Sequence, residues 1–348
     1  MSPYVLTALM FSLAWGTTIT FASSHWLLAW MGLEMNTLAI LPLMAQNHHP
    51  RAVEATTKYF LAQATAAAVI LFASLTNAWL TGQWDIQQTA HPLPLTMITL
   101  ALAFKIGLAP LHSWLPEVLQ GLDLTTGLIL STWQKLAPFA LIVQVQPYNQ
   151  TTIISLGLIS ILVGGYGGLN QTQLRKILAY SSIAHLGWMT LVVQFNPSLT
   201  MLALLTYFLM TFSAFQTFKL GSSTNINTLS TSWALSPLLA ALASLVFLAL
   251  GGLPPLVGFA PKWLILHQLT MHGLAPTATA AALLSLLSLY FYLRLSYAAA
   301  LTISPNTLTN TVPWRLPTLQ RTLPLATATM ATIAFLPLTP TAIALLAP

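Results

Sequence analysis

The chain has 348 residues, of which 56 % are hydrophobic and only 5 % are charged, and its mean hydropathy is +0.76. Soluble domains average about 25 % charged residues, so this composition excludes an ordinary soluble enzyme, and its hydrophobicity excludes an intrinsically disordered chain. The net charge of +6 comes from bases scattered singly between apolar segments, and cysteine is absent, which excludes a nucleic-acid partner and a cysteine-ligated metal centre.

Apolar segments long enough to cross a bilayer recur along the whole chain. The first residues carry no basic or Arg-rich stretch, so we expect neither a secretory signal nor a transit peptide. The pattern predicts an all-α polytopic membrane protein with about eleven transmembrane helices. In chain order we expect them at residues 3–22, 25–45, 56–80, 93–121, 125–145, 150–170, 177–195, 198–220, 236–272, 276–300 and 323–346.

Two segments, 93–121 and 236–272, exceed the roughly 20 residues that span a bilayer. Both contain helix breakers, because proline removes a backbone donor and clashes with the preceding turn. We therefore expect two discontinuous helices, each unwound against protein or a hydrated cavity. The breakers are Gly107 and Pro110 in the first segment, and Gly251, Gly252, Pro254, Pro255, Gly258 and Pro261 in the second.

The two broken helices are the fourth and the ninth, so they lie five helices apart. This spacing predicts two five-helix repeats, each with one broken helix, plus one C-terminal helix. Because five is an odd number, the second repeat is expected to be inverted, as in many transporters. The expected divisions are residues 1–145, 146–300 and 301–348, the last comprising an inside loop and the final helix.

The charges in the expected loops predict the orientation. With eleven helices, one side collects eight bases and the opposite loops carry none. The positive-inside rule then puts the N-terminus inside and the C-terminus outside. The eight bases are Arg51, Lys58, Arg175, Lys176, Lys219, Arg294, Arg315 and Arg321.

Four charged residues fall inside expected spans instead: Glu34, Lys105, Lys135 and Lys262. A charge at a helix centre costs about 2.5–3.5 kcal/mol on insertion scales. Snorkelling to the surface suits Arg294 near a helix end, but these four lie too deep for it. A purely structural buried ion pair stays open as an alternative to a functional role.

Burial disfavours the charged form of a lysine, so a buried lysine can take up and release a proton near neutral pH. Glu34 close to Lys105 would favour its ammonium form, and withdrawal of Glu34 would favour proton release. His112, seven residues after Lys105, and His185, in the middle of segment 177–195, are candidates to link these sites. The alternative for each histidine is a hydrogen-bonded core residue.

Other motifs are missing from the sequence. There is no GxGxxG, no Walker A and no metal-ligand spacing, so we expect no nucleotide, flavin or metal site in this chain. Glu117 and Asp123 flank the inner end of segment 93–121, where an interfacial or subunit-contacting role is expected.

Five segments are specific in their order and spacing: WMGLEMNTLAILPL, FKIGLAPLHSWLPEVLQG, STWQKLAPF, LRKILAYSSIAHLGWM and GGLPPLVGFAPKW. Together they resemble the chain 2 family of antiporter-like membrane subunits in mitochondrial NADH–ubiquinone oxidoreductase, respiratory complex I. The resemblance covers nearly the whole chain, and the length resembles the shortened, vertebrate-type form of the family.

The resemblance implies a core membrane-arm subunit that translocates protons while other subunits transfer electrons from NADH to ubiquinone. NADH, FMN, iron–sulfur clusters and ubiquinone would then be bound by those other subunits, with no cofactor or redox site in this chain. The family's glutamate–lysine pair, central lysine and second broken-helix lysine match Glu34 with Lys105, Lys135 and Lys262, and His112 matches a polar position near the pair.

The same resemblance implies partners and a location. We expect other membrane-arm subunits, including a neighbouring antiporter-like chain 4 and small chains such as 4L, together with accessory subunits and inner-membrane lipids such as cardiolipin. The chain would be a multi-pass protein of the mitochondrial inner membrane, with its N-terminus in the matrix and its C-terminus in the intermembrane space.

Two alternatives stay open. One is a stand-alone cation/proton antiporter of the same fold, which sodium-dependent transport by the isolated chain would favour. The other is a non-pumping membrane scaffold, which intact pumping after joint loss of Glu34 and Lys105 would favour.

Overall fold

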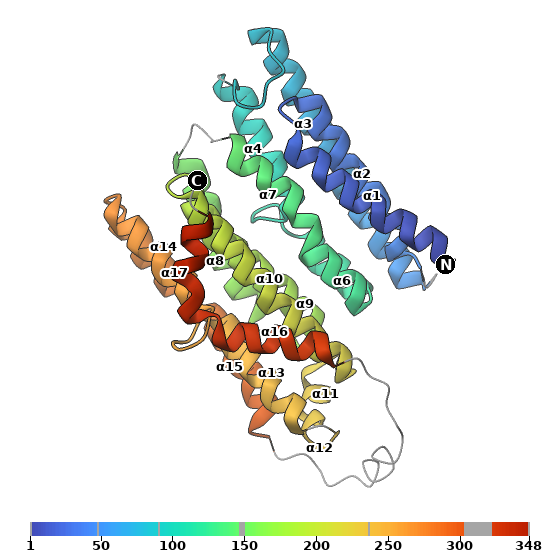
Figure 1. The fold of residues 1–348 in the computed structure, drawn as a ribbon, viewed down its shortest axis with the longest axis vertical. Helices are drawn as coiled ribbons and strands as arrows, with labels where there is room; N and C mark the ends of the chain where they lie inside the picture. Colours follow the sequence, from blue (N-terminus) through green and yellow to red (C-terminus); the bar gives the residue numbers. More distant parts are fainter. Residues whose placement is uncertain are drawn as a thin grey trace. The chain divides into compact units, whose positions relative to one another are not determined.

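The computed structural model describes residues 2–46, 49–89, 91–145, 150–235, 237–302 and 322–346 (Figure 1). Within these ranges the secondary structure is helical, apart from isolated bridges that join His25 to Asp85 and Gln173 to Asn225. The predicted all-α class is confirmed. Arg315, Arg321 and most of the loop that contains them lie outside the described residues.

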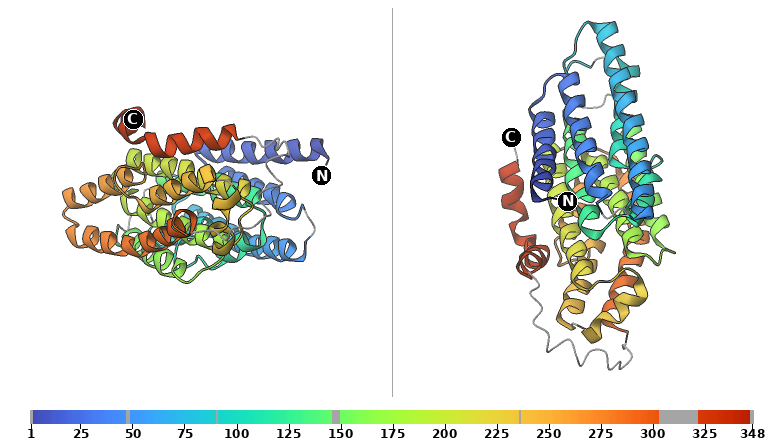
Figure 2. Two further views of the ribbon diagram at one scale, coloured as in Figure 1. Left: turned by 90° about the horizontal axis from the view of Figure 1, so that it is seen from below. Right: turned by 90° about the vertical axis from the view of Figure 1, so that its right-hand side faces the viewer.

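The chain forms two compact units, Met1–Ser160 and Ile161–Pro348. In the first unit α1 packs along α2, and α3 contacts α2, α4 and α5 (Figures 1 and 2). Its helices are α1 (Pro3–Ala22), α2 (Trp26–Met44), α3 (Pro50–Thr81), α4 (Pro92–Ile106), α5 (Trp114–Gly121), α6 (Leu124–Ser131), α7 (Trp133–Val145) and the start of α8 (Gln150–Gly168).

In the second unit α10 is the central helix, because it contacts α9, α13, α14, α16 and α17. The helices are α9 (Leu174–Val192), α10 (Pro197–Leu220), α11 (Ile226–Ser230), α12 (Ser232–Leu235), α13 (Pro237–Gly251), α14 (Phe259–Met271), α15 (Ala275–Ala300), α16 (Leu323–Ala334), the 3₁₀ helix η3 (Leu336–Leu338) and α17 (Thr339–Leu346). The short helices α11 and α12 were not predicted from the sequence.

Local sequence explains where several helices begin. Proline stands in the first turn of α1, α3, α4 and α10. Backbone N–H groups in the first turn have no partner within the helix, so the N–H that proline lacks costs no helix hydrogen bond. Histidine precedes three helices: the Nδ1 atoms of His25, His49 and His91 each accept a hydrogen bond from the backbone N–H two residues later. These three histidines are therefore helix caps.

Both predicted helix interruptions are present. Segment 93–121 divides into α4 and α5, and segment 236–272 divides into α13 and α14. Each interruption opens with a left-handed glycine, Gly107 at φ 86° and Gly252 at φ 79°, a conformation that costs glycine little. A further bend of 67° separates α16 from α17 at η3, where Pro337 cannot donate to the helix ladder.

The number of spans differs from the expected eleven. Among the described residues, seven helices are long and apolar enough to cross a membrane, or eight if α16 and α17 form one span. Eleven would be reached only if α4, α9 and α13 also crossed. As halves of broken helices, α4 and α13 have 15 residues each, about 22 Å of helix against a hydrocarbon core of about 30 Å.

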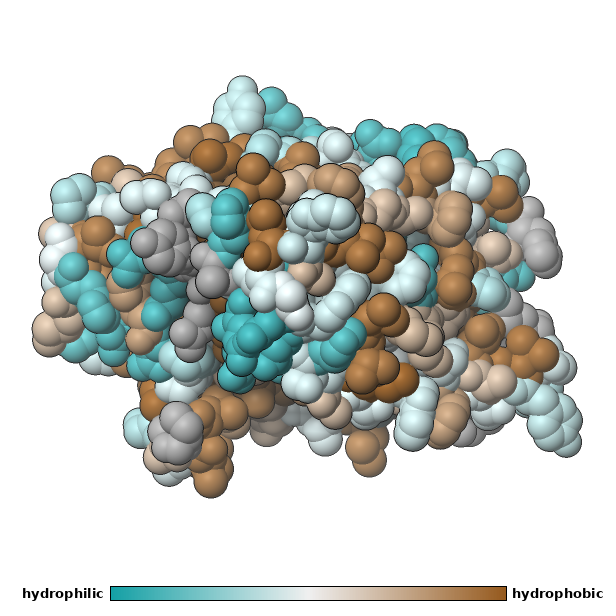
Figure 3. Space-filling model, turned by 90° about the horizontal axis from the view of Figure 1, so that it is seen from above, coloured by the Kyte–Doolittle hydropathy of each residue, from teal (hydrophilic) through white to brown (hydrophobic). Residues whose placement is uncertain are grey.

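Figure 3 shows hydrophobic residues spread over the face that it draws, among hydrophilic ones. Large side chains such as Phe11 and Trp15 on α1, and Leu61 and Trp79 on α3, are exposed. Apolar exposure of this extent belongs to a surface that faces lipid or other membrane subunits rather than water.

Candidate functional site

A small cavity in the first unit brings together two of the predicted lysines. Its volume of about 10 Å³ is close to the space that one water molecule needs. Residues of the six helices α2 to α7 line it, and the polar side chains other than Trp114 are those of Asn36, Thr37, Tyr59, Gln63, Lys105, Gln134 and Lys135. Lys105 and Lys135, which are thirty residues apart in sequence, therefore share one polar cavity.

Lys105 lies in the last turn of α4, just before the break at Gly107, and is 5 % exposed. Its backbone carbonyl accepts a hydrogen bond of 3.3 Å from Gln63 Nε2 on α3. Its Nζ atom is fully buried and has no hydrogen-bond partner among the described residues. A buried ammonium without a direct partner is costly, so this position is not explained by stability.

The expected Glu34–Lys105 pair is not a direct ion pair. Among the described residues, Lys58 forms ion pairs with Glu54 and Glu117, whereas Lys105 Nζ forms none with Glu34 on α2. The α2 side chains that line the cavity beside Lys105 are Leu33, Asn36 and Thr37, and Glu34 is not among them. The carboxylate oxygen Glu34 Oε2 is buried and, within the described ranges, has no hydrogen-bond partner.

Lys135 lies in the first turn of α7 and is 3 % exposed. Its neighbour Gln134 donates a hydrogen bond of 3.2 Å from Nε2 to the backbone carbonyl of Asn36 on α2. The amide side chain of Asn36 is itself buried, at 2 % exposure, and neither of its polar atoms has a partner in the described part of the chain. The wall between the two lysines is thus polar and incompletely satisfied.

Sequence reasoning missed five of these polar wall residues: Asn36, Thr37, Tyr59, Gln63 and Gln134. Tyr59 and Gln63 stand four residues apart, which places them on one face of α3. A polar side chain repeated at helical spacing inside an apolar run was the available signal.

His112 lies in the break between α4 and α5 and does not line the cavity. Its side chain is half-buried, and Nδ1 lies 3.1 Å from the carbonyl oxygen of Pro110. The structure therefore places His112 at the interruption itself, beyond the end of the helix that carries Lys105.

In the second unit, Lys262 bridges the other break. It lies in the first turn of α14, and its Nζ atom donates a hydrogen bond of 2.9 Å to the carbonyl of Gly251, at the end of α13. A cation is favoured at a helix C-terminus, where unpaired carbonyls concentrate negative partial charge. Lys262 thus joins the two halves of the broken helix.

His185, on α9, is 9 % exposed and lies between two tyrosines that the sequence did not single out. Its ring centre is 5.6 Å from that of Tyr207 on α10 and 6.5 Å from that of Tyr292 on α15. The Tyr292 hydroxyl lies 3.4 Å from His185 Nε2. A buried tyrosine hydroxyl needs a polar partner. A tyrosine inside an apolar segment, as Tyr207 and Tyr292 are, was therefore the available sign of a polar neighbour.

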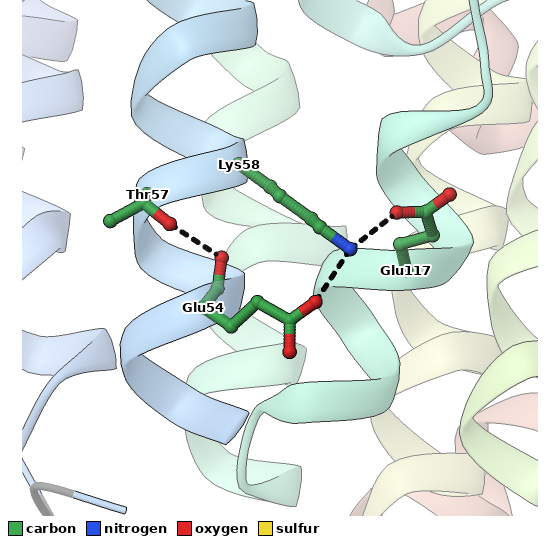
Figure 4. Close-up of polar contacts among 4 residues, drawn as sticks. All are labelled: Glu54, Thr57, Lys58 and Glu117. Carbon is green, nitrogen blue, oxygen red and sulfur yellow. Dashed lines mark hydrogen bonds and ion pairs between the residues drawn. The ribbon is translucent and has the colours of Figure 1, made fainter. Parts of the chain in front are cut away.

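Charged residues also meet at the exposed ends of α3 and α5 (Figure 4). Lys58 Nζ lies 2.8 Å from carboxylate oxygens of both Glu54 and Glu117. These groups border an open groove of about 420 Å³. Because the ion pairs are exposed, each contributes little to stability. Glu117 is exposed in this position, and its interfacial or subunit-contacting role stays a prediction.

Arg294 was expected to mark a loop. It lies within α15, and its Nη1 atom donates a hydrogen bond of 2.8 Å to the carbonyl of Leu169, directly after the end of α8. The guanidinium therefore caps the C-terminal end of α8.

Comparisons with known proteins agree along the chain. Residues 23–288 match the family model described as NADH:quinone oxidoreductase/Mrp antiporter, TM, and residues 289–343 match the NADH dehydrogenase subunit 2 C-terminus. The NADH-ubiquinone oxidoreductase chain 2 of Tetraodon nigroviridis is 70 % identical over 98 % of both chains. That of Oncorhynchus mykiss is 68 % identical over 100 % of both.

Solved structures give the same result. A chain of respiratory complex I from Thermus thermophilus has a TM-score of 0.88 at 28 % identity, covering 100 % of this chain and 81 % of that chain. A chain of the Mrp complex from Dietzia sp. DQ12-45-1b has a TM-score of 0.83 over 97 % of this chain and 76 % of that chain, but at 17 % identity it shows the fold alone. The resemblance found in the sequence is confirmed: this chain belongs to the NADH:quinone oxidoreductase/Mrp antiporter family, as an antiporter-like subunit of the membrane arm of complex I.

Proposed function

We propose that this chain moves protons across the mitochondrial inner membrane, driven by electron transfer from NADH to ubiquinone in other subunits of the complex. The observation that carries the proposal is the cavity shared by Lys105 and Lys135. Two buried lysines beside one small polar cavity can exchange a proton through a single water, because each can gain or lose a proton when its surroundings change.

The wall of the cavity supports this role. Lys105 Nζ and both polar atoms of Asn36 are buried without hydrogen-bond partners in the described residues. Buried polar groups are nearly always satisfied by protein or by ordered water. A water in the cavity would satisfy these groups and connect the lysines, with Glu34 acting on Lys105 from a distance.

Proton transfer continues, in this proposal, through His185 and Lys262 in the second unit, and His112 at the first break offers a further polar group. Lys262 bonds the carbonyl of Gly251 across the second break. The proton state of Lys262 is therefore coupled to how firmly α13 and α14 are held together.

The redox chemistry is assigned to other subunits in this proposal. NADH, FMN, the iron–sulfur clusters and ubiquinone would be bound there, and this chain would hold no cofactor or metal. Among the described residues, no three histidine, aspartate or glutamate side chains gather as a metal site.

The proposal also includes the arrangement in the membrane. We propose that the chain crosses the membrane eleven times and contains two repeats of opposite orientation, residues 1–145 and 146–300. The N-terminus would lie in the matrix and the C-terminus in the intermembrane space. Partners would be the neighbouring antiporter-like chain 4, small chains such as 4L, accessory subunits and cardiolipin.

The test is proton uptake driven by NADH oxidation in the assembled complex, reconstituted into vesicles. Lys105→Ala and Lys135→Ala should each lower proton uptake at least about tenfold, the scale of a lost acid–base group. Lys219→Ala is the matched control, because Lys219 is exposed at the end of α10. If both buried-lysine variants pump like this control, the chain is a scaffold and the proposal is wrong.

A further inference from the structure

Each of the two long helix interruptions is bridged by one side chain from the helix that follows it. Across the second break, Lys262 Nζ donates to the carbonyl of Gly251 at 2.9 Å. Across the first break, the indole Nε1 of Trp114, in the first turn of α5, donates to the carbonyl of Phe104 at 3.1 Å. Phe104 directly precedes Lys105, so this bridge reaches the turn of α4 that carries Lys105.

The backbone around Lys105 is held by two side chains that lie outside α4. The last four carbonyls of a helix have no partner within it, and those of Phe104 and Lys105 belong to this group. Trp114 donates to the first, and Gln63 on α3 donates to the second at 3.3 Å. Gln63 is 4 % exposed and Trp114 is 8 % exposed, so both hydrogen bonds form away from bulk water, where they are stronger.

The side chain of Lys105 is not held by a bond at its own end. Nζ has no hydrogen-bond partner among the described residues, so the place of the amine depends on the backbone that carries it. Trp114 and Gln63 also line the cavity beside Lys105. The Trp114 ring packs edge-on against Tyr59, with ring centres 5.8 Å apart. The two donors therefore hold the turn of α4 and form part of the wall next to it.

The two bridges differ in their chemistry. The indole N–H of Trp114 is a donor that does not titrate, whereas the amine of Lys262 can gain and lose a proton. The bridge at the first break therefore keeps its donor when protons enter or leave the cavity. Lys105 can change its own proton state without loss of the bonds that hold its turn.

We propose that Trp114 and Gln63 are positioning residues that hold the turn of α4 carrying Lys105, so that the amine stays beside the cavity in both of its proton states. This role rests on proton transfer through Lys105 in the proposed function. Position matters for such a transfer, because a misplacement of about 1 Å can cost a reaction about a hundredfold in rate.

Loss of either donor tests the role. Trp114→Phe removes the N–H and keeps an aromatic ring beside Tyr59, and Gln63→Leu removes the amide at similar size. NADH-driven proton uptake in vesicles, measured per complex that a native gel shows to be intact, should fall at least about threefold in each variant. With both changes together, proton uptake should approach that of Lys105→Ala.

Trp30→Phe is the matched control for the loss of an indole bond. Trp30 Nε1 on α2 donates to the carbonyl of Ala67 on α3, also at 3.1 Å, and Trp30 does not line the cavity. Both tryptophan variants lose one hydrogen bond between helices, so thermal inactivation of the complex should shift to lower temperature in both. Only Trp114→Phe should also lose proton uptake, while Trp30→Phe should pump like wild type.

The pH profile of proton uptake separates positioning from packing. The surroundings of a titrating group set its pKa, so the pH of half-maximal uptake should move in Trp114→Phe and keep its wild-type value in Trp30→Phe. Lys135 and Tyr59, the other titrating groups that line the cavity, are the same in both variants.

Wild-type proton uptake with an unshifted pH profile in Trp114→Phe and Gln63→Leu would overturn the positioning role, and if one variant does not assemble, the other decides. A further loss when Trp114→Phe is added to Lys105→Ala would also overturn it, because no amine is left to position. Lys105→Ala distinguishes the two levels. If it pumps like wild type, the proposed function and the positioning role both fail, whereas its failure beside normal Trp114→Phe and Gln63→Leu overturns the positioning role alone.

Discussion

Asn36 illustrates at the residue scale how function and stability differ in this chain. Its side chain is buried on α2 beside Lys105, and its two amide atoms have no partner among the described residues. Leaving buried polar atoms unsatisfied costs free energy. The Asn36 side chain is therefore explained by the polar wall that it gives the cavity, and not by a contribution to the stability of the fold.

Asn36→Leu should separate the two effects. Leucine has nearly the same shape and removes two unsatisfied polar atoms, so the assembled complex should keep or gain thermal stability. Because the cavity wall becomes apolar, NADH-driven proton uptake should fall severalfold. The two readouts are the midpoint of thermal inactivation and proton uptake in vesicles. A variant that pumps normally would show that Asn36 does not serve the path between the lysines.

Charged site residues could be predicted from the sequence because a charge in a membrane span is costly and therefore conspicuous. Lys105 and Lys135 were found in this way. The uncharged wall residues could not be found with the same certainty, because many polar side chains in apolar helices bond their own backbone, as Ser160 does with Leu156. Which of them face a cavity depends on helix packing.

At the scale of elements, prolines and glycines made the helix limits predictable. The ends of α1 and α10 lie within one residue of the prediction, and both long interruptions were expected. The helices α11 and α12 were not, because stretches this short depend on contacts with α13 and α15 rather than on their own periodicity. The division between α6 and α7 at Thr132 was missed for the same reason.

Arg294 gives a prediction about elements alone. It caps the end of α8 through the Leu169 carbonyl. Arg294→Leu leaves this carbonyl unpaired, which should destabilise the second unit by about 1–3 kcal/mol. Thermal inactivation of the assembled complex should shift to lower temperature while protons taken up per NADH stay constant. Arg294→Lys, which retains a donor, should lie closer to wild type; equal stability of all three forms would refute the capping role.

At the scale of the whole molecule, the number of membrane crossings is harder to predict from the sequence than the helices themselves. Seven or eight helices meet the criteria for a span, and the predicted eleven also needs the shorter α4 and α13 and the more polar α9. Arg175 and Lys176 begin α9, which lowers its hydropathy, yet most of its side chains are buried. Burial by neighbouring helices allows such a helix to cross, and composition alone does not reveal this.

An epitope tag at each end tests the topology in mitoplasts treated with protease. Eleven crossings put the C-terminal tag outside, where the protease removes it, and the N-terminal tag inside, where it is protected. Protection of both tags would require an even number of crossings and would refute the eleven-helix arrangement.

Proton uptake by the assembled complex with Lys105→Arg is the measurement closest to the central claim, that Lys105 carries protons by gaining and losing one. Arginine keeps the positive charge in the cavity but stays protonated in proteins. The proposed mechanism predicts that this variant assembles and oxidises NADH with an artificial acceptor, yet takes up protons as poorly as Lys105→Ala. Proton uptake at the wild-type rate would show that Lys105 serves as a fixed charge, and would contradict proton transfer through it.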